Sequence, residues 1–135
     1  MSVNPQKAMC KYLKKLAAEI ERVAADPKVE AVHDLRVSVR RAVQAIRVFE
    51  SELPAGATGK LRRRINKIRD QAALVRDRDV IYELLQKHQL PDFDPACSYL
   101  RGERAMAAMQ LQEAMRKLIK QRKPKQWIVV MESCQ

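Results

Sequence analysis

The 135-residue chain is poor in the residues that form disulfide frameworks, membrane spans or flexible linkers. Its three cysteines, Cys10, Cys97 and Cys134, are odd in number, widely spaced and form no C-x-x-C pair, which argues against a disulfide framework or a structural zinc site and fits a reducing cytoplasm. No stretch approaches the roughly 18 apolar residues of a membrane span, and the N-terminus lacks the apolar run of a signal peptide. With no Gly/Ser linker or internal repeat, we expect one soluble cytoplasmic domain that does not bind a membrane.

Acidic residues are also scarce relative to basic ones. The chain has 27 Lys and Arg against 16 Asp and Glu, a net charge of +11 and a pI near 10.0. Such a charge attracts polyanions, among them nucleic acid, anionic membranes and phosphate polymers. Composition therefore indicates a class of partner without choosing a member of it.

Apolar residues recur every three or four positions in four segments, and no strand pattern of comparable length competes with them. Asn4 with Pro5, Asp26 with Pro27, and Asp94 with Pro95 have the pattern of a helix N-cap followed by proline. The expected helices span residues 5–25, about 27–53, about 58–90 and about 95–122, and Pro54 followed by Gly56 and Gly59 is the signal that ends the second. We therefore predict an all-α fold, an up-down four-helix bundle with one long third helix.

The chain after the fourth helix is expected to be a tail. Pro124 should end the helix, which divides the chain into a helical domain, residues 1–125, and a C-terminal tail, residues 126–135. Residues 127–131 would form an exposed apolar patch unless they fold back or meet a partner.

The second helix carries an unusual polar stripe. At about 100° per residue, one face within roughly 80° collects His33, Arg36, Arg40, Gln44 and Arg47. The adjoining arc is apolar and is expected to face the core; it comprises Val32, Leu35, Val39, Val43 and Ile46. No carboxylate falls on the stripe to pair with its cations, which favours an anionic ligand.

The third helix repeats this arrangement. Arg62, Arg69 and Arg76 are spaced by seven residues and lie beside the apolar seam, whereas Lys60 and Arg64 lie further around the helix. If the second and third helices pack side by side, their basic stripes line one groove from both walls. We expect that groove to be the binding surface.

The two basic helices also contain a pair of motifs that resemble those of the CHAD family, the conserved histidine α-helical domain. The first motif combines His33 and Arg36 with the pair Arg40 and Arg41, and the second combines Arg76 with two nearby aspartates, Asp77 and Asp79. The similarity covers roughly residues 6–122. It implies a helical fold with a basic surface that binds inorganic polyphosphate, often at polyphosphate granules. By motif position the resemblance supplies His33, Arg36, Arg40, Arg41 and Arg76 as binding residues, whereas Arg47, Arg62 and Arg69 come from helical geometry.

The chain departs from this family in its length. CHAD domains usually contain two four-helix halves, whereas this chain has room for one half, with the second basic helix absent. The simplest expectation is a homodimer, held together by the surplus apolar seam of the third helix or by residues 127–131.

The two aspartates of the second motif have the D-x-D spacing of some metal-binding pairs. Residues i and i+2 of a helix point roughly 200° apart, so Asp77 and Asp79 cannot hold one ion together. We expect them to orient nearby arginines, and we expect no metal and no cofactor.

Two other functions deserve comparison with polyphosphate binding. His33 and Asp34 are similar to the start of a metal-dependent HD phosphohydrolase site, but further ligands are lacking and His88 is the one other histidine, so we expect no catalysis. Nucleic-acid binding remains the alternative, because adjacent arginine stripes suit a phosphodiester backbone. Aromatic residues make up only 4% of the chain and none interleaves with the stripes, which disfavours base stacking.

Overall fold

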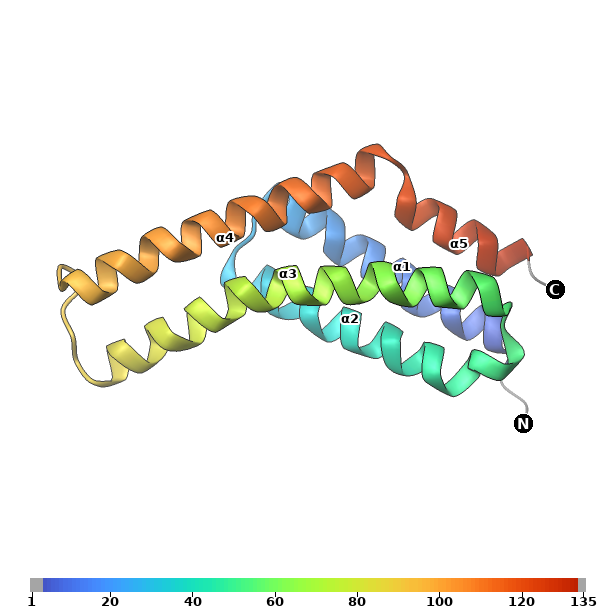
Figure 1. Cartoon of the computed structure of the whole chain (residues 1–135), viewed down its shortest axis with the longest axis horizontal. Coiled ribbons are helices and arrows are strands. Elements are labelled where there is room, and N and C mark those ends of the chain that lie inside the picture. The colour runs from blue at the N-terminus through green and yellow to red at the C-terminus, as the bar shows by residue number, and fades with distance from the viewer. Residues whose placement is uncertain (1–3, 134–135) are drawn as a thin grey trace.

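The computed structural model describes residues 4–133, which form five helices and a short 3-10 turn (Figure 1). These elements are α1 (Pro5–Ala25), α2 (Val29–Phe49), η1 (Glu50–Glu52), α3 (Ala55–Lys87), α4 (Pro95–Lys120) and α5 (Lys123–Ser133). The expected all-α bundle is confirmed, with one helix more than predicted. None of the helices in this described part is both long and apolar enough to cross a membrane.

Two of the three predicted helix starts are confirmed by their caps. The Asn4 side chain accepts a hydrogen bond from the Lys7 amide at 3.1 Å, and Asp94 accepts one from the Ala96 amide at 2.9 Å. The third start was wrong: Asp26 instead follows the end of α1, its amide donating to the Arg22 carbonyl, and α2 begins at Val29. An Asp-Pro pair is compatible with either end of a connection, and here it lies wholly between the helices.

The connection between α2 and α3, residues 50–54, lies earlier in the chain than predicted. Helix α2 ends at Phe49, and α3 begins directly after Pro54, so Gly56 and Gly59 lie inside its first turns instead of in a loop. Both glycines are exposed, and each costs only about 1 kcal/mol relative to alanine in a helix. A helix of 33 residues tolerates that penalty because its packed face, which includes Leu61, Ile65 and Ile68, is buried in the core.

The expected tail is instead helix α5, which folds back onto α1. Arg122 adopts a left-handed conformation (φ 56°) that ends α4 and turns the chain, and Pro124 then occupies the first turn of α5, where proline is favourable. Trp127 and Met131 are only 8% and 1% exposed, and both belong to the main core. The predicted division between residues 125 and 126 falls within this helix.

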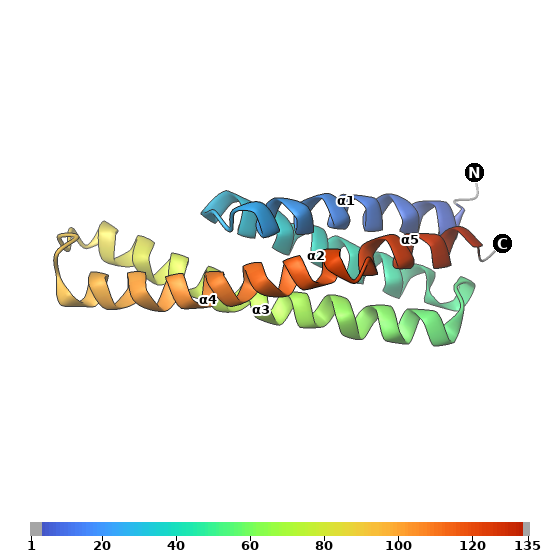
Figure 2. The same cartoon turned by 90° about the horizontal axis from the view of Figure 1, so that it is seen from above.

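Helices α2 and α3 pack mainly against their neighbours along the chain, whereas α5 folds back onto α1 (Figures 1 and 2). Helix α3 lies between α2 and α4, while α1 contacts α2, α4 and α5. Beyond the connection between α1 and α2, the distal parts of α3 and α4 project as a two-helix hairpin. We call residues 77–106 the arm, because none of its described residues belongs to the core cluster, which includes Val75 and resumes at Ala107.

Candidate anion-binding site

The basic stripe of α2 lies on the outside of the bundle because the apolar arc of this helix is buried in the core. The five apolar residues predicted to face the core are all buried: Val32, Leu35, Val39, Val43 and Ile46. His33, Arg40 and Arg47 are exposed, and Arg36 is partly buried. The orientation predicted for this helix is confirmed.

The stripe forms one wall of a groove between α2 and α3, which we call the α2–α3 groove. It has a volume of about 320 Å³. Its lining residues are His33, Arg36, Val37, Arg40, Val43, Gln44, Arg47 and Arg69. The groove thus combines four predicted side chains of α2 with one of α3, and its lining contains no carboxylate.

Arg36 is the least solvated cation of this groove. Its Nε atom is buried and has no hydrogen-bond partner among the described residues. An unpaired buried donor costs roughly 1–3 kcal/mol, more when it is charged. The groove therefore contains a guanidinium that would gain from an acceptor supplied by a ligand.

The acid nearest to the stripe in sequence faces away from the groove. Asp34 accepts a hydrogen bond from Arg22 of α1, and this bond raises the pKa of Arg22 above its usual value. Because Asp34 is paired on the α1 side, it does not neutralise the cations of α2 that face α3. The groove keeps its excess of positive charge because the acid of α2 that lies next to the stripe in sequence is paired on the other side of the helix.

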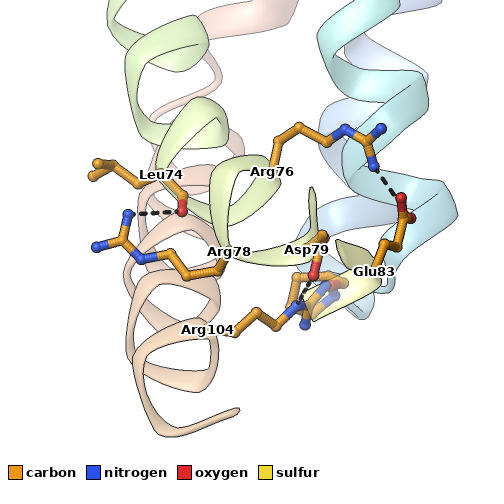
Figure 3. A network of polar contacts seen from close by, with 7 residues as sticks. Leu74, Arg76, Arg78, Asp79, Glu83 and Arg104 are labelled. Atoms are coloured by element: carbon orange, nitrogen blue, oxygen red, sulfur yellow. Dashed lines mark hydrogen bonds and ion pairs between the residues drawn. The ribbon is translucent and has the colours of Figure 1, made fainter. Parts of the chain in front are cut away.

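Arg62 and Arg76 were predicted to extend this site, but neither lines the groove. The Arg62 guanidinium lies 2.6 Å from the Glu50 carboxylate, an ion pair that lacks hydrogen-bond geometry. Arg76 points toward α2 in Figure 3 and lies 3.8 Å from Glu83. Each of these arginines already faces a carboxylate, so less of its charge is available to a ligand.

Arg41 lies beside the stripe on α2, in a second, adjacent groove between α1 and α2. This α1–α2 groove is lined by Lys11, Tyr12, Lys14, Lys15, Ala18, Ser38, Arg41 and Gln44. Gln44 lines both grooves and marks the ridge between them. The α1 lysines were not predicted to belong to the site, although their spacing puts them on one face of that helix.

The two aspartates of the second motif have different surroundings. Asp79 is buried and accepts a hydrogen bond from Arg104 Nε at 2.9 Å, while Arg104 also donates to the Pro27 carbonyl at 2.8 Å (Figure 3). Asp77 is exposed. Arg104, which the sequence did not single out, therefore joins the base of the arm to the connection between α1 and α2.

Metal ligands are not gathered anywhere in residues 4–133: no group of three or more His, Cys, Asp or Glu could hold an ion. His88 follows the C-terminal end of α3, whereas His33 lies near the start of α2. In the described residues, the groove can therefore bind an anion through the charges and N–H donors of its arginines and histidine.

Comparison with known families agrees with the motif pattern. A family model described as the CHAD domain matches residues 7–128, which includes both basic motifs, the four long helices and the first part of α5. No curated protein and no solved structure matches the chain.

Proposed function

Because the chain belongs to the CHAD domain family, we propose that it binds inorganic polyphosphate in the α2–α3 groove without catalysing a reaction on it. The observation that carries this proposal is the lining of that groove, which contains five basic side chains and no carboxylate. A chain of phosphates offers repeated anionic oxygens, and arginine can donate to them through two parallel N–H groups while staying charged. Ligand and groove are therefore complementary in charge and in hydrogen bonding.

The buried guanidinium of Arg36 supports the same ligand. Its unpaired Nε would be satisfied by a phosphate oxygen, so part of the cost of burying it would be recovered on binding. A polyanion would also relieve the repulsion between Arg36 and its neighbours Arg40 and Arg69 across the groove. Affinity would then be highest where several phosphates enter together.

Polyphosphate fits this groove better than nucleic acid does. Proteins that hold single strands stack bases on aromatic side chains, each worth about 1–3 kcal/mol, and no aromatic side chain lines the α2–α3 groove. A bare phosphate chain has nothing to stack. Tyr12 lines the neighbouring α1–α2 groove, which leaves nucleic acid as the competing ligand in the test below.

The binding surface for longer chains would continue over α2. Gln44 lines both grooves, so a polymer leaving the α2–α3 groove can reach Arg41 and the lysines of α1. On this proposal the α2–α3 groove sets the affinity for short chains, and the α1–α2 groove adds contacts for longer ones.

We further propose that the protein acts in the cytoplasm as a homodimer and associates with polyphosphate granules. The granule association rests on family membership, and the cytoplasmic setting on the spacing of the cysteines. The dimer rests on the large apolar side chains that the arm and its base leave exposed.

Competition binding tests the ligand. Labelled polyphosphate bound to the full chain at physiological salt should be displaced by unlabelled polyphosphate far more effectively than by tRNA or duplex DNA at equal phosphate concentration. Equal or better displacement by either nucleic acid would overturn the proposal. Release of phosphate from polyphosphate with added Mg²⁺ or Mn²⁺ would contradict its non-catalytic part.

A further inference from the structure

The arm and its base expose large apolar side chains on the outside of the bundle. Leu74 and Ile81 of α3 are 47% and 45% exposed, and Tyr99 and Met106 of α4 are 68% and 58% exposed. In each helix the two residues are seven positions, or about two helical turns, apart, so they lie on the same face of the helix. We call these four side chains the arm face.

Contacts between α3 and α4 place all four side chains on the same side of the hairpin. Arg78 lies between Leu74 and Ile81 along α3, and its guanidinium is 3.7 Å from the Glu103 carboxylate. Glu103 in turn lies between Tyr99 and Met106 along α4, and its hydrogen bond raises the pKa of Tyr99. The arm face is therefore an apolar surface with one ion pair at its centre.

Helix α3 is apolar on two sides, which indicates two packing partners. Ala72 and Val75 are buried against the core, whereas Leu74 and Ile81 point elsewhere and remain almost half exposed. Burying one large apolar side chain is worth about 1.5–3 kcal/mol. A partner that covers all four side chains would therefore gain more free energy of burial than one that covers a single side chain.

The charge of the arm differs from that of the rest of the chain. Residues 77–106 contain six Asp and Glu but only four Lys and Arg, in a protein whose totals are 16 and 27. The excess positive charge thus lies outside the arm. Two copies meeting through their basic surfaces would repel each other, whereas two arms avoid most of that repulsion.

We propose that two copies of this chain associate through their arm faces about a two-fold axis, so that two α3–α4 hairpins form one intermolecular four-helix bundle. The symmetry allows Arg78 of each copy to approach Glu103 of the other, which makes the surface self-complementary. Residues 127–131, an earlier candidate for the interface, include Trp127 and Met131, which are buried inside their own chain. The arm face is thus the interface of the proposed homodimer, and association through it does not depend on polyphosphate binding.

The dimensions of the arm face predict a weak dimer. Two adjacent helices over eight residues each cover roughly 12 by 20 Å, on the order of 250 Å² per copy. Stable interfaces usually bury about 800 Å² per partner. Self-association should therefore depend on concentration, with a dissociation constant in the micromolar to millimolar range.

Sedimentation of the full chain from micromolar to millimolar concentration, in reducing buffer without polyphosphate, tests the proposal. The average mass should rise toward twice that of the monomer, and added salt should strengthen association because it screens repulsion between the basic surfaces. Polyphosphate binding should respond to salt in the opposite direction. Arg40→Ala, on the basic stripe, should dimerise as the wild type does, so loss of polyphosphate binding and loss of dimerisation can be told apart.

Two sets of variants locate the interface. Ile81→Glu should weaken dimerisation by tenfold or more, whereas Val129→Glu, an equally drastic change at an exposed site on α5, should leave it unchanged. Arg78→Glu and Glu103→Arg should each weaken dimerisation, and the double variant should restore it. A strict monomer at millimolar concentration, equal losses for Ile81→Glu and Val129→Glu, or no restoration in the double variant would each overturn the proposal.

Discussion

Replacing Arg40 by alanine tests the α2–α3 groove with little disturbance to the fold. Arg40 is exposed, lines the groove, and makes no hydrogen bond or ion pair within residues 4–133. Removing it deletes a cation without opening a cavity in the core. The free energy of unfolding should therefore change by less than about 0.5 kcal/mol, as is usual for surface substitutions.

The expected loss of binding is much larger than this change in stability. A hydrogen bond to a charged group contributes about 1–3 kcal/mol, so the dissociation constant for polyphosphate should rise roughly 5- to 150-fold. Arg36→Ala should weaken binding by a similar factor. It should not destabilise the fold, because it removes a buried Nε that has no partner.

Isothermal titration calorimetry with polyphosphate of one defined length measures these effects, and circular dichroism verifies that helicity is unchanged. Lys125→Ala is the matched control, since it removes the same charge from an exposed site on α5 that lines neither groove. The control should lose less than twofold in affinity. Equal losses for Arg36, Arg40 and Lys125 would refute the reasoning, because they would mean a diffuse attraction to net charge.

Three further outcomes are expected. The logarithm of the polyphosphate association constant should fall linearly with the logarithm of salt concentration, measured by repeating the calorimetry at several ionic strengths, and a flat response would contradict binding to a polyanion. Arg41→Ala should weaken binding of long polyphosphate more than that of chains too short to leave the α2–α3 groove; equal losses for both lengths would contradict the proposed path over Gln44. Trp127→Ala should lower the free energy of unfolding in urea by about 3–5 kcal/mol, because α5 buries this side chain in the core, and a loss below 1 kcal/mol would show that α5 is not docked.

The basic wall of α2 could be predicted from sequence because it depends on one helix only. Helical geometry fixes the angle between the apolar arc and the stripe, so burial of Leu35 and Ile46 necessarily exposes Arg40 and Arg47. Arg69 was predicted by one added assumption, that consecutive helices pack as neighbours. Short connections made that assumption reliable.

Features that depend on more distant packing could not be predicted in this way. Arg104 is recognisable as an anchor only when α4 lies against the connection between α1 and α2, 77 residues away along the chain. Helix α5 was missed because Pro124 is equally compatible with the end of one helix and the first turn of the next. The left-handed conformation of Arg122 decides between them, and nothing local in the sequence requires it.

Because α3 and α4 extend beyond the other helices, the free energy of local unfolding should be lower in the arm than in the body of the bundle. In the body α3 also packs against α2, and α4 also packs against α1 and α5, whereas in the arm the two helices have mainly each other, joined at the base by Asp79 and Arg104. Amide hydrogens of the distal arm should therefore exchange with solvent through local openings that leave the grooves folded. The chain can in this way loosen at one end while its cationic surface keeps its shape.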